Sequence, residues 1–525
     1  MKKLLRSLSI LTLALSLTAC GGGGSDEGTE TGDTGYKDTI LWGIANDQDS
    51  LDPQTNVSNN VVLPQIYSSL IKIDQEGKVA PDLATEWGVG EDGLTWTFKL
   101  RDDVTFHNGK HLTSADVVAT FERVLNEDDP YRYTSSYTEF IDSVTADGDY
   151  TVIIKTKTPY GPFEAKIAAC NMGILDKDYI EQYGHDLGTT PASVNGTGPY
   201  KVTEWSIGEK MVFEAYDDYF GGTPKTKNVI MQVVPEQNSR AIAVETGQMD
   251  IVSGLAPDDV ARFSNGEVAG VNVYSEPSNG MHLFQFNCSG VLSDVKLRQA
   301  INYGIDRQAI IDTLYSVIGE TAALAPVTPD VIGYSELGVI EYNPEKAKEL
   351  LKEAGYEDGL TINLMTTAVY NKGVEMAEII SEQLKEIGIT VNIETVEKAV
   401  FSASWGVTPD QFKWDMFIMG AGGSTDAGSA LYRVWHTEDD GLNTNNYGFY
   451  SNAEVDALLE EGNVTTDPEK RTEIYKRAME IIWEEDPVGA FMNYRNNIYG
   501  LSSKVEGFSV NAGNTPDMMN FQVRN

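Results

Sequence analysis

Few side chains in this sequence have the types and spacing that catalysis or metal binding requires. His107 and His111 are four residues apart, so a helix would place both on one face, where they could share a metal ion. The Asn108-Gly109 pair between them indicates a turn instead, and no glutamate adjoins His107 to act as a base. No two cysteines have the CxxC spacing of a structural zinc site. We therefore predict no metal site and no cofactor.

The sequence also lacks the patterns of nucleophilic enzymes and nucleotide-binding proteins. No GxSxG elbow is present. The glycine-rich segment 420–423 (GAGG) has neither the third glycine of a dinucleotide fingerprint nor the Lys-Ser/Thr of a phosphate loop. Because hydrolysis needs a placed nucleophile or metal beside a matched base, we predict that the chain is not an enzyme.

The charge balance restricts the partners. The net charge is −40, from 79 acidic and 39 basic residues, and such a field repels nucleic acid. We therefore predict no nucleic-acid partner. A cationic, zwitterionic or peptide ligand is compatible with this charge.

The N-terminus is typical of an export signal. Three basic side chains within residues 2–6 precede an apolar run over 8–17, which is shorter than the roughly 20 residues of a membrane-spanning helix. The run ends in Leu17-Thr18-Ala19-Cys20, which resembles the bacterial lipobox, whose cysteine becomes lipidated. We predict a signal peptide over 1–19 and lipidation at Cys20.

Residues 21–35 (GGGGSDEGTETGDTG) have no apolar side chain. We therefore predict that 20–35 form a flexible tether. A diacylglycerol on Cys20 supplies two acyl chains, enough for stable anchoring. We predict an extracytoplasmic protein that is held on the cell membrane by this cysteine. Cys170 and Cys288 then remain, and the sequence is compatible with a disulfide between them or with two unpaired thiols.

Strand-like and helix-like segments alternate along the chain, which predicts an α/β protein. The length of 525 residues predicts two or three lobes. The strand-like runs are rich in β-branched and aromatic residues. They lie at 95–100, 151–156, 210–216, 228–235, 271–275 and 282–288.

Capping residues mark the helices. Asn343 and Pro344 predict the start of a helix that Gly355 ends. Ser451 with Glu454 predicts a capping box at the start of another helix.

Several motifs, in order along the chain, resemble the family 5 solute-binding proteins of ABC importers, which bind peptides, glutathione or nickel. The segment DGLTWTFKLRDDVTFHNGKHLTSADVVATFERVL is close to the family signature, and GTGPYK matches another of its elements. The matching segments are 50–53 (SLDP), 80–84 with Trp87, 92–125, 196–201, 293–311 and 449–462.

This resemblance implies a type II (class C) periplasmic-binding-protein-like fold, with two α/β lobes joined by crossing strands and an extra inserted domain. The first lobe would combine 36–73, 190–283 and 496–525. The inserted domain would be 74–189, and the second lobe 284–495. The crossing segments would lie near 278–287 and 493–497.

The resemblance also implies residues that contact a ligand. In peptide binders of the family an aspartate meets the ligand ammonium, and the matching residue is Asp426; capping of the following helix is the alternative role. Ser424 and Thr425 resemble the glutathione-binding branch, whereas Ala421 and Ala427 depart from the peptide binders. For a ligand carboxylate we predict Arg132 or Arg433, and for the cleft lining Tyr131, Tyr133, Asn446 and Tyr447.

The function implied is that of an extracytoplasmic solute-binding lipoprotein of an ABC importer. It would act as a monomer, bind di- or oligopeptides or glutathione between two lobes, and deliver them to the permease. A nickel chelate or an oligosaccharide is the alternative ligand. A surface hydrolase or an adhesin is the alternative class of protein, and a thermal-shift screen of these ligands separates the hypotheses.

Overall fold

The computed structural model describes residues 35–525 apart from 57–60, 406 and 438–445. The predicted signal peptide, the predicted lipidation site Cys20 and the tether up to residue 34 lie outside the described residues. Within the described part, no helix is both long and apolar enough to cross a membrane.

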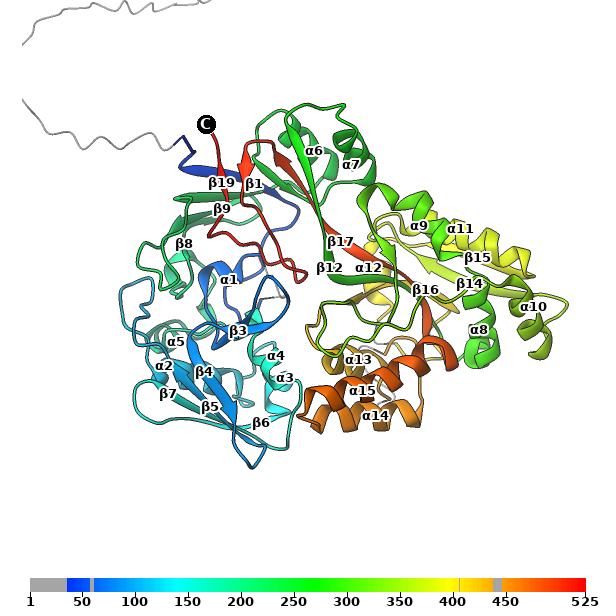
Figure 1. Ribbon diagram of the computed structural model, residues 1–525, viewed down its shortest axis with the longest axis horizontal. Helices are drawn as coiled ribbons and strands as arrows, with labels where there is room; N and C mark the ends of the chain where they lie inside the picture. The colour runs from blue at the N-terminus through cyan, green and yellow to red at the C-terminus, as the bar shows by residue number, and fades with distance from the viewer. Residues whose placement is uncertain (1–34, 57–60, 406, 438–445) are drawn as a thin grey trace, which may run out of the picture.

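One large sheet runs through most of the molecule, and two long strands at its centre join the two halves (Figure 1). These are β12 (Val271–Phe286) and β17 (Gly489–Ser502), which pair antiparallel. In order from one edge, the strands are β15 (Ile389–Thr395), β14 (Leu360–Thr366), β16 (Met416–Gly422), β12, β17, β11 (Ile251–Ser253), β1 (Thr39–Ile44), β10 (Asn228–Val233), β9 (Lys210–Ala215) and β8 (Tyr200–Ser206), with β13 (Thr321–Ala322) on β17.

The sequence predicted two strands, at 271–275 and 282–288, where the structure has the single strand β12. The strand instead continues through a register shift between Pro277 and Met281, because a β-bulge can absorb residues that a regular ladder cannot pair. The two segments predicted to cross between the lobes lie largely in β12 and in β17.

The first lobe contains strands β1 and β8–β11, with a core that the C-terminus completes. Trp42 of β1 is fully buried and makes edge contacts with Tyr499, Phe508 and Phe521, at centroid distances of 6.0, 5.8 and 6.0 Å. Chain ends far apart in sequence are therefore fixed in one core. Its smaller elements are α1 (Leu63–Ile66), α6 (Gln237–Glu245), α7 (Pro257–Ser264), β18 (Val505–Glu506) and β19 (Gln522–Val523).

The inserted domain has its own four-stranded antiparallel sheet and its own core, which includes Phe98, Phe121 and Ile154. Helix α2 (Ser114–Val124) starts at a capping box formed by Thr113 and Asp116. The other elements are β4 (Ala84–Val89), β5 (Thr95–Leu100), β7 (Thr151–Thr156), β6 (Ile141–Ala146), α3 (Thr134–Thr138), α4 (Phe163–Ile167) and α5 (Lys177–Tyr183), with the β2 (Ile71–Ile73) and β3 (Val79–Pro81) hairpin beside them.

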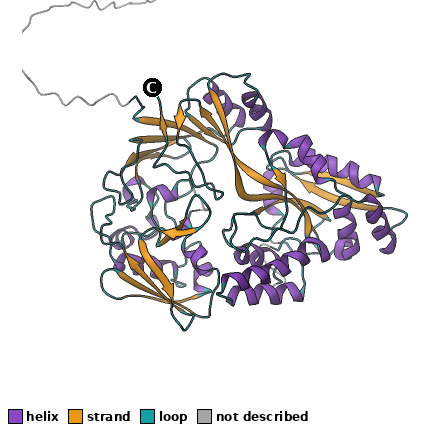
Figure 2. Ribbon diagram, in the orientation of Figure 1, coloured by secondary structure: helices purple, strands orange, loops and turns teal. Residues whose placement is uncertain are grey.

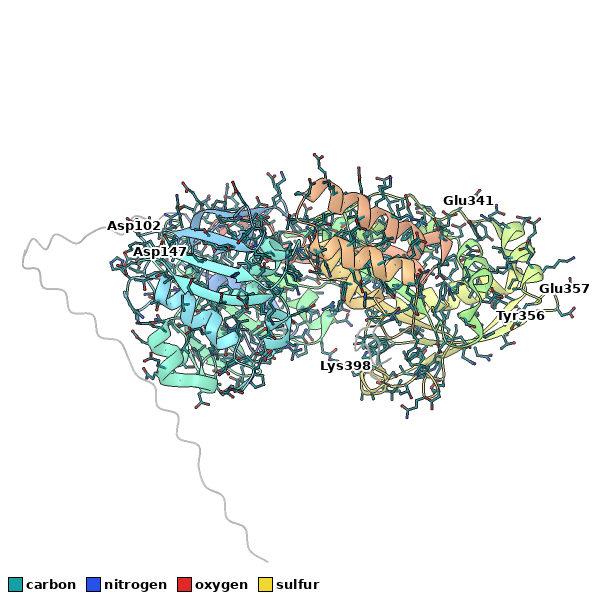
Figure 3. All side chains as sticks on the ribbon, turned by 90° about the horizontal axis from the view of Figure 1, so that it is seen from below. Asp102, Asp147, Glu341, Tyr356, Glu357 and Lys398 are labelled. Carbon is teal, nitrogen blue, oxygen red and sulfur yellow. The ribbon has the colours of Figure 1, made fainter. Side chains whose placement is uncertain are left out.

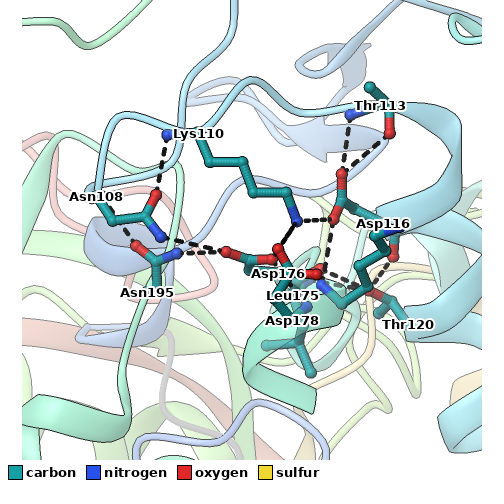
Figure 4. Close-up of polar contacts among 10 residues, drawn as sticks. Asn108, Lys110, Thr113, Asp116, Thr120, Leu175, Asp176, Asp178 and Asn195 are labelled. Atoms are coloured by element: carbon teal, nitrogen blue, oxygen red, sulfur yellow. Dashed lines mark hydrogen bonds and ion pairs between the residues drawn. The ribbon is translucent and has the colours of Figure 1, made fainter. Parts of the chain in front are cut away.

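The His107–His111 segment of this domain is a turn, as predicted, with Gly109 at φ +87°. His107 Nε2 lies 3.0 Å from the Gly198 carbonyl oxygen, and burial lowers the pKa of His107 to about 4. The ammonium of Lys110 lies 2.9, 2.5 and 3.0 Å from carboxylate oxygens of Asp116, Asp176 and Asp178 (Figure 4). This cluster fastens the turn to α2 and α5.

The second lobe carries most of the helices (Figure 2). Asn343 caps α10 by accepting from Lys346 N at 3.0 Å, with Pro344 at the first position, which confirms the predicted start. The predicted Ser451 cap is wrong: α14 begins one residue later, because the carboxamide of Asn452 accepts from both Glu454 N and Val455 N. The helices are α8 (Val295–Tyr303), α9 (Arg307–Leu314), α10 (Pro344–Glu353), α11 (Gly373–Glu386), α12 (Lys398–Ala403), α13 (Ala427–Trp435), α14 (Ala453–Val464) and α15 (Pro468–Glu480).

The whole molecule is elongated. Asp102 and Asp147 of the inserted domain lie toward one end, and Glu341 and Glu357 of the second lobe lie toward the other (Figure 3). Between these ends, α14 and α15 adjoin the inserted domain (Figures 1 and 3).

Candidate ligand-binding cleft

The inserted domain and the second lobe touch at their facing edges. Gly161 N donates to the carbonyl oxygen of Asn463, at the end of α14, over 2.7 Å. A Cβ at Gly161 would lie 2.4 Å from both Arg471 Nε and the Thr465 carbonyl oxygen. The two bodies are therefore packed so closely here that only glycine fits.

A small cavity, of about 20 Å³, lies beside the crossing strands on the second lobe. Its lining combines β12, the end of β16, the loop at 326–331 and α13. The lining residues include Asn279, Thr328, Gly422, Ser424, Val434 and Trp435. The predicted ligand residue Ser424 is therefore in a cavity wall.

A second cavity, of about 320 Å³, is lined mostly by the second lobe, with one residue of the first lobe opposite. Gln237 at the start of α6 faces residues 368–372, the loop that follows β14 and includes Tyr370, and the first turn of α11. Pockets for small ligands have volumes from about 300 to 1,000 Å³, so this cavity has room for a small ligand or for one end of a longer one.

Asp426 is buried at the N-terminus of α13, and its carboxylate is fully engaged. Oδ1 accepts from Gly428 N at 2.9 Å and from Ser429 N at 3.4 Å, so the alternative role as helix cap is confirmed. Arg471 Nη2 of α15 lies 2.8 Å from both carboxylate oxygens. Burial lowers the pKa of Arg471, but the charges and hydrogen bonds of Asp426 and Tyr475 together outweigh burial and leave that pKa raised. Contact between Asp426 and a ligand stays a prediction.

The other predicted residues of the second lobe lie around α13. The Ser424 hydroxyl donates to the Asp426 carbonyl oxygen over 3.0 Å, and the Thr425 carbonyl accepts from Ile332 N. Asn446 closes a turn through two hydrogen bonds with the backbone of Tyr450, of 2.7 and 3.0 Å.

Arg433 is exposed on α13, and its charge reaches Lys166 of the inserted domain and Tyr447. Tyr447 stacks on Trp405 at 4.4 Å. Burial lowers the pKa of Lys166, and the positive charge of Arg433 lowers it further.

The three predicted residues of the inserted domain contact the first lobe and their own domain. Tyr131 stacks on His185 at 4.5 Å and on the Arg123 guanidinium at 3.8 Å. The Tyr133 hydroxyl donates to the Asn56 carbonyl oxygen over 2.8 Å, and Arg132 is exposed, with its guanidinium 6.0 Å from the Tyr133 ring centroid. The predicted site residues therefore lie in two groups, one around Asp426 in the second lobe and one around Tyr133 in the inserted domain.

Sequence reasoning missed a polar group on the crossing strands. His282 of β12 lies 3.2 Å from Asn493 of β17, and Asn493 also donates to Glu320. Glu320 accepts from Asn496 N at 3.2 Å, and burial raises the pKa of Glu320 to about 7. Arg495 stands between these asparagines. The sequence did contain a signal for this polar group: four polar residues lie within 493–497 of an otherwise apolar strand.

Comparison with known proteins identifies the family. The model of the bacterial extracellular solute-binding proteins, family 5, matches residues 78–443, which is more than half of the chain. The chain belongs to this family. The resemblance inferred from the sequence motifs is therefore confirmed.

Curated members of family 5 match over most of their length. The glutathione-binding protein GsiB of Salmonella typhi is 29% identical over 458 residues, covering 86% of this chain and 88% of GsiB. The oligopeptide-binding protein AppA of Bacillus subtilis is 29% identical over 555 residues, covering 97% and 96%. DppA of Helicobacter pylori, solved with the peptide STSA, superposes with a TM-score of 0.76 at 26% identity, covering 93% of this chain and 98% of DppA.

Family 5 membership carries several conclusions. The two-lobed type II fold predicted from the sequence is confirmed by the solved relatives. Family 5 proteins are extracytoplasmic binding proteins of transport systems and not enzymes, so the prediction of no enzymatic activity is also confirmed.

Proposed function

We propose that this protein binds short peptides, glutathione included, between its two lobes and delivers them to the permease of an ABC importer. The observation that carries the proposal is the cavity in which Gln237 of the first lobe faces the loop at 368–372 of the second lobe, where Tyr370 packs edge-on against His282 of the crossing strand β12. A ligand that touches both lobes favours the closed arrangement by the free energy of those contacts. The relatives named for glutathione, oligopeptides and a bound peptide support the ligand class.

The proposed contacts come from both sides of the cleft. On the second lobe they are Ser424, Thr425, Asp426, Arg433, Asn446 and Tyr447. On the inserted domain they are Tyr131, Arg132 and Tyr133. A ligand ammonium at Asp426 would share the carboxylate with Arg471, since both oxygens already accept from that guanidinium. Hydrogen bonds to charged groups contribute about 1.5–3 kcal/mol each, and micromolar affinity needs only about 8 kcal/mol, so a few contacts suffice.

We further propose that the protein is a monomer tethered to the membrane through a lipid on Cys20. The lipobox-like Leu17–Cys20 segment and the apolar-free tether support this. Replacement of Cys20 by alanine is expected to move the protein from the membrane fraction to the soluble fraction, as measured by detergent partitioning.

A thermal-shift screen tests the ligand class. The purified protein is heated with alanine peptides, reduced glutathione, a nickel–histidine chelate and an oligosaccharide. A peptide or glutathione at 100 times its dissociation constant is expected to add about 2.7 kcal/mol of stability. A shift with the chelate or the sugar alone would contradict the peptide proposal and select the alternative ligand.

A further inference from the structure

Arginines inside this protein find acceptors, with one exception on the crossing strands. Arg123 pairs with Asp52, Arg298 with Asp486 and Arg471 with Asp426. Arg240 and Arg307 instead donate to backbone carbonyl groups. Arg495 of β17 is partly buried, yet across the described residues its guanidinium forms no ion pair and donates no hydrogen bond.

The backbone around Arg495 leaves space for its guanidinium. The β-bulge of β12 places Gly280 beside it, where a Cβ would lie 2.9 Å from Arg495 Nη2 and 3.1 Å from Nε. The Ser278 hydroxyl donates to the Arg495 carbonyl oxygen over 2.8 Å and holds the two strands together at this point. The guanidinium therefore rests against Gly280 on the surface of the crossing strands.

Glu320, whose carboxyl group feels the charge of Arg495, does not neutralise it. Glu320 accepts from the Asn493 side chain and from Asn496 N, so its oxygens have other partners. Burial raises the pKa of Glu320 to about 7, although the charge of Arg495 opposes that rise. An ion pair with Arg495 would hold the carboxyl ionised at lower pH.

Arg495 also lies close to the lining of both cavities. Burial raises the pKa of Tyr370, a wall residue of the larger cavity, and the positive charge of Arg495 opposes the rise. On its other side, Gly280 adjoins Asn279, which lines the cavity beside α13. Gly280 and Gly422, another lining residue, pair across β12 and β16. The guanidinium is therefore near residues of both linings, although Arg495 itself lines neither cavity.

We propose that Arg495 anchors a carboxylate of the ligand at the floor of the cleft, an inference that rests on the proposed peptide-binding function. A guanidinium presents parallel N–H donors that match the two oxygens of a carboxylate. Partial burial strengthens the contact, because water competes less for it. The ligand class is thus a peptide with a free C-terminal or side-chain carboxylate, bound with this group toward the crossing strands.

Calorimetric titration tests the assignment. Alanine peptides from dialanine to pentaalanine are compared as free acids and as C-terminal amides, together with reduced glutathione. A lost charge-assisted contact of about 1.5–3 kcal/mol corresponds to an affinity loss of about 10- to 150-fold. That loss is expected for Arg495→Gln with the free acids, and for the unaltered protein when acid is replaced by amide. With the amides, Arg495→Gln and the unaltered protein are expected to bind alike.

Two further variants control the test. Gly280→Ala is expected to displace the guanidinium and to weaken the free acids only, so it serves if Arg495→Gln does not fold. Arg524→Gln, at an exposed ion pair near the C-terminus, is expected to leave binding unchanged. Equal binding of acid and amide by the unaltered protein would overturn the carboxylate anchor while the peptide function stands. Failure of every peptide and of glutathione to bind would overturn the proposed function as well.

Discussion

Two arginines of this protein differ in their relation to a nearby carboxyl group: Arg471 contacts it, and Arg495 does not. Arg471 contacts both oxygens of Asp426 and both side chains are buried. Arg495 has Glu320 in its vicinity, but the asparagines of β17 occupy that carboxyl. The difference separates a pair that builds the second lobe from a charge that is left for a ligand. Removal of one partner of a buried pair destabilises a fold, because it leaves the other charge buried and unpaired, whereas an unsatisfied charge in a cleft is available for binding.

The largest effect is expected at Arg471. Its replacement by alanine leaves the Asp426 carboxylate buried without a counter-charge, which costs about 3–5 kcal/mol. Urea unfolding followed by circular dichroism measures the loss. Arg495→Gln is the matched comparison and is expected to change the unfolding free energy by less than about 1 kcal/mol, as for groups without a specific partner. Equal losses would remove the distinction between the two arginines.

The pH dependence of stability tests the state of Glu320. Burial raises the pKa of Glu320 to about 7 in the folded protein, above the ordinary value of 4.5. The folded chain therefore keeps a proton that the unfolded chain has already released. The contribution of Glu320 to the free energy of unfolding is fully present below about pH 4.5 and is lost as the pH rises through about 7. The total loss is about 3 kcal/mol.

Glu320→Gln is expected to remove this fall, because the amide does not titrate. The measurement is the unfolding free energy of both proteins at about pH 5 and about pH 8. If the unfolding free energy of the variant falls as steeply with pH as that of the unaltered protein, Glu320 is ionised over this whole range. Arg495 would then be paired, like Arg471.

The contact between Arg471 and the inserted domain is expected to affect closure. Gly161→Ala places a Cβ where Arg471 Nε and the Thr465 carbonyl oxygen lie 2.4 Å away. Overpacking of this kind costs about 1–3 kcal/mol, and separation of the two bodies relieves it. Small-angle scattering should show a larger radius of gyration and titration a weaker peptide affinity. Gly88→Ala, where no atom lies within 4 Å of the added Cβ, is the control.

The smallest effect is expected at Asn452, a helix cap that can be compared with Asp426. Asn452 caps α14 as Asp426 caps α13, but its side chain also donates to Asp486 and contacts no arginine among the residues that the structure describes. Asn452→Ala is expected to cost about 1 kcal/mol, against almost nothing for Ser451→Ala. Thermal unfolding compares the two, and a larger loss at Ser451 would contradict the observed helix start.

Local signals in the sequence predicted much of the fold. Caps and turn residues such as Asn343 and Gly109 act within a few residues, and the strands at 95–100 and 151–156 have the predicted bounds. β12 was divided in the prediction because a bulge depends on the partner strand. Cys170 and Cys288 pack against different cores and form no disulfide with each other.

The candidate site was less predictable, because its contacts join distant segments. The partner of Asp426 is 45 residues away, and Arg495 meets Ser278 across 217 residues. The family motif indicated Asp426 but could not indicate that Arg471 occupies it. Arg495 becomes noticeable only when the acceptors of every other buried arginine are known.

Hydrogen–deuterium exchange with and without a bound peptide tests most directly that the ligand lies between the lobes. We expect slower exchange of the amides at 278–286 and 489–497 in the crossing strands, and at 368–375 and 421–435 in the cavity walls, because closure suppresses local opening. Protection confined to the surface of one lobe, with the crossing strands unchanged, would contradict the account.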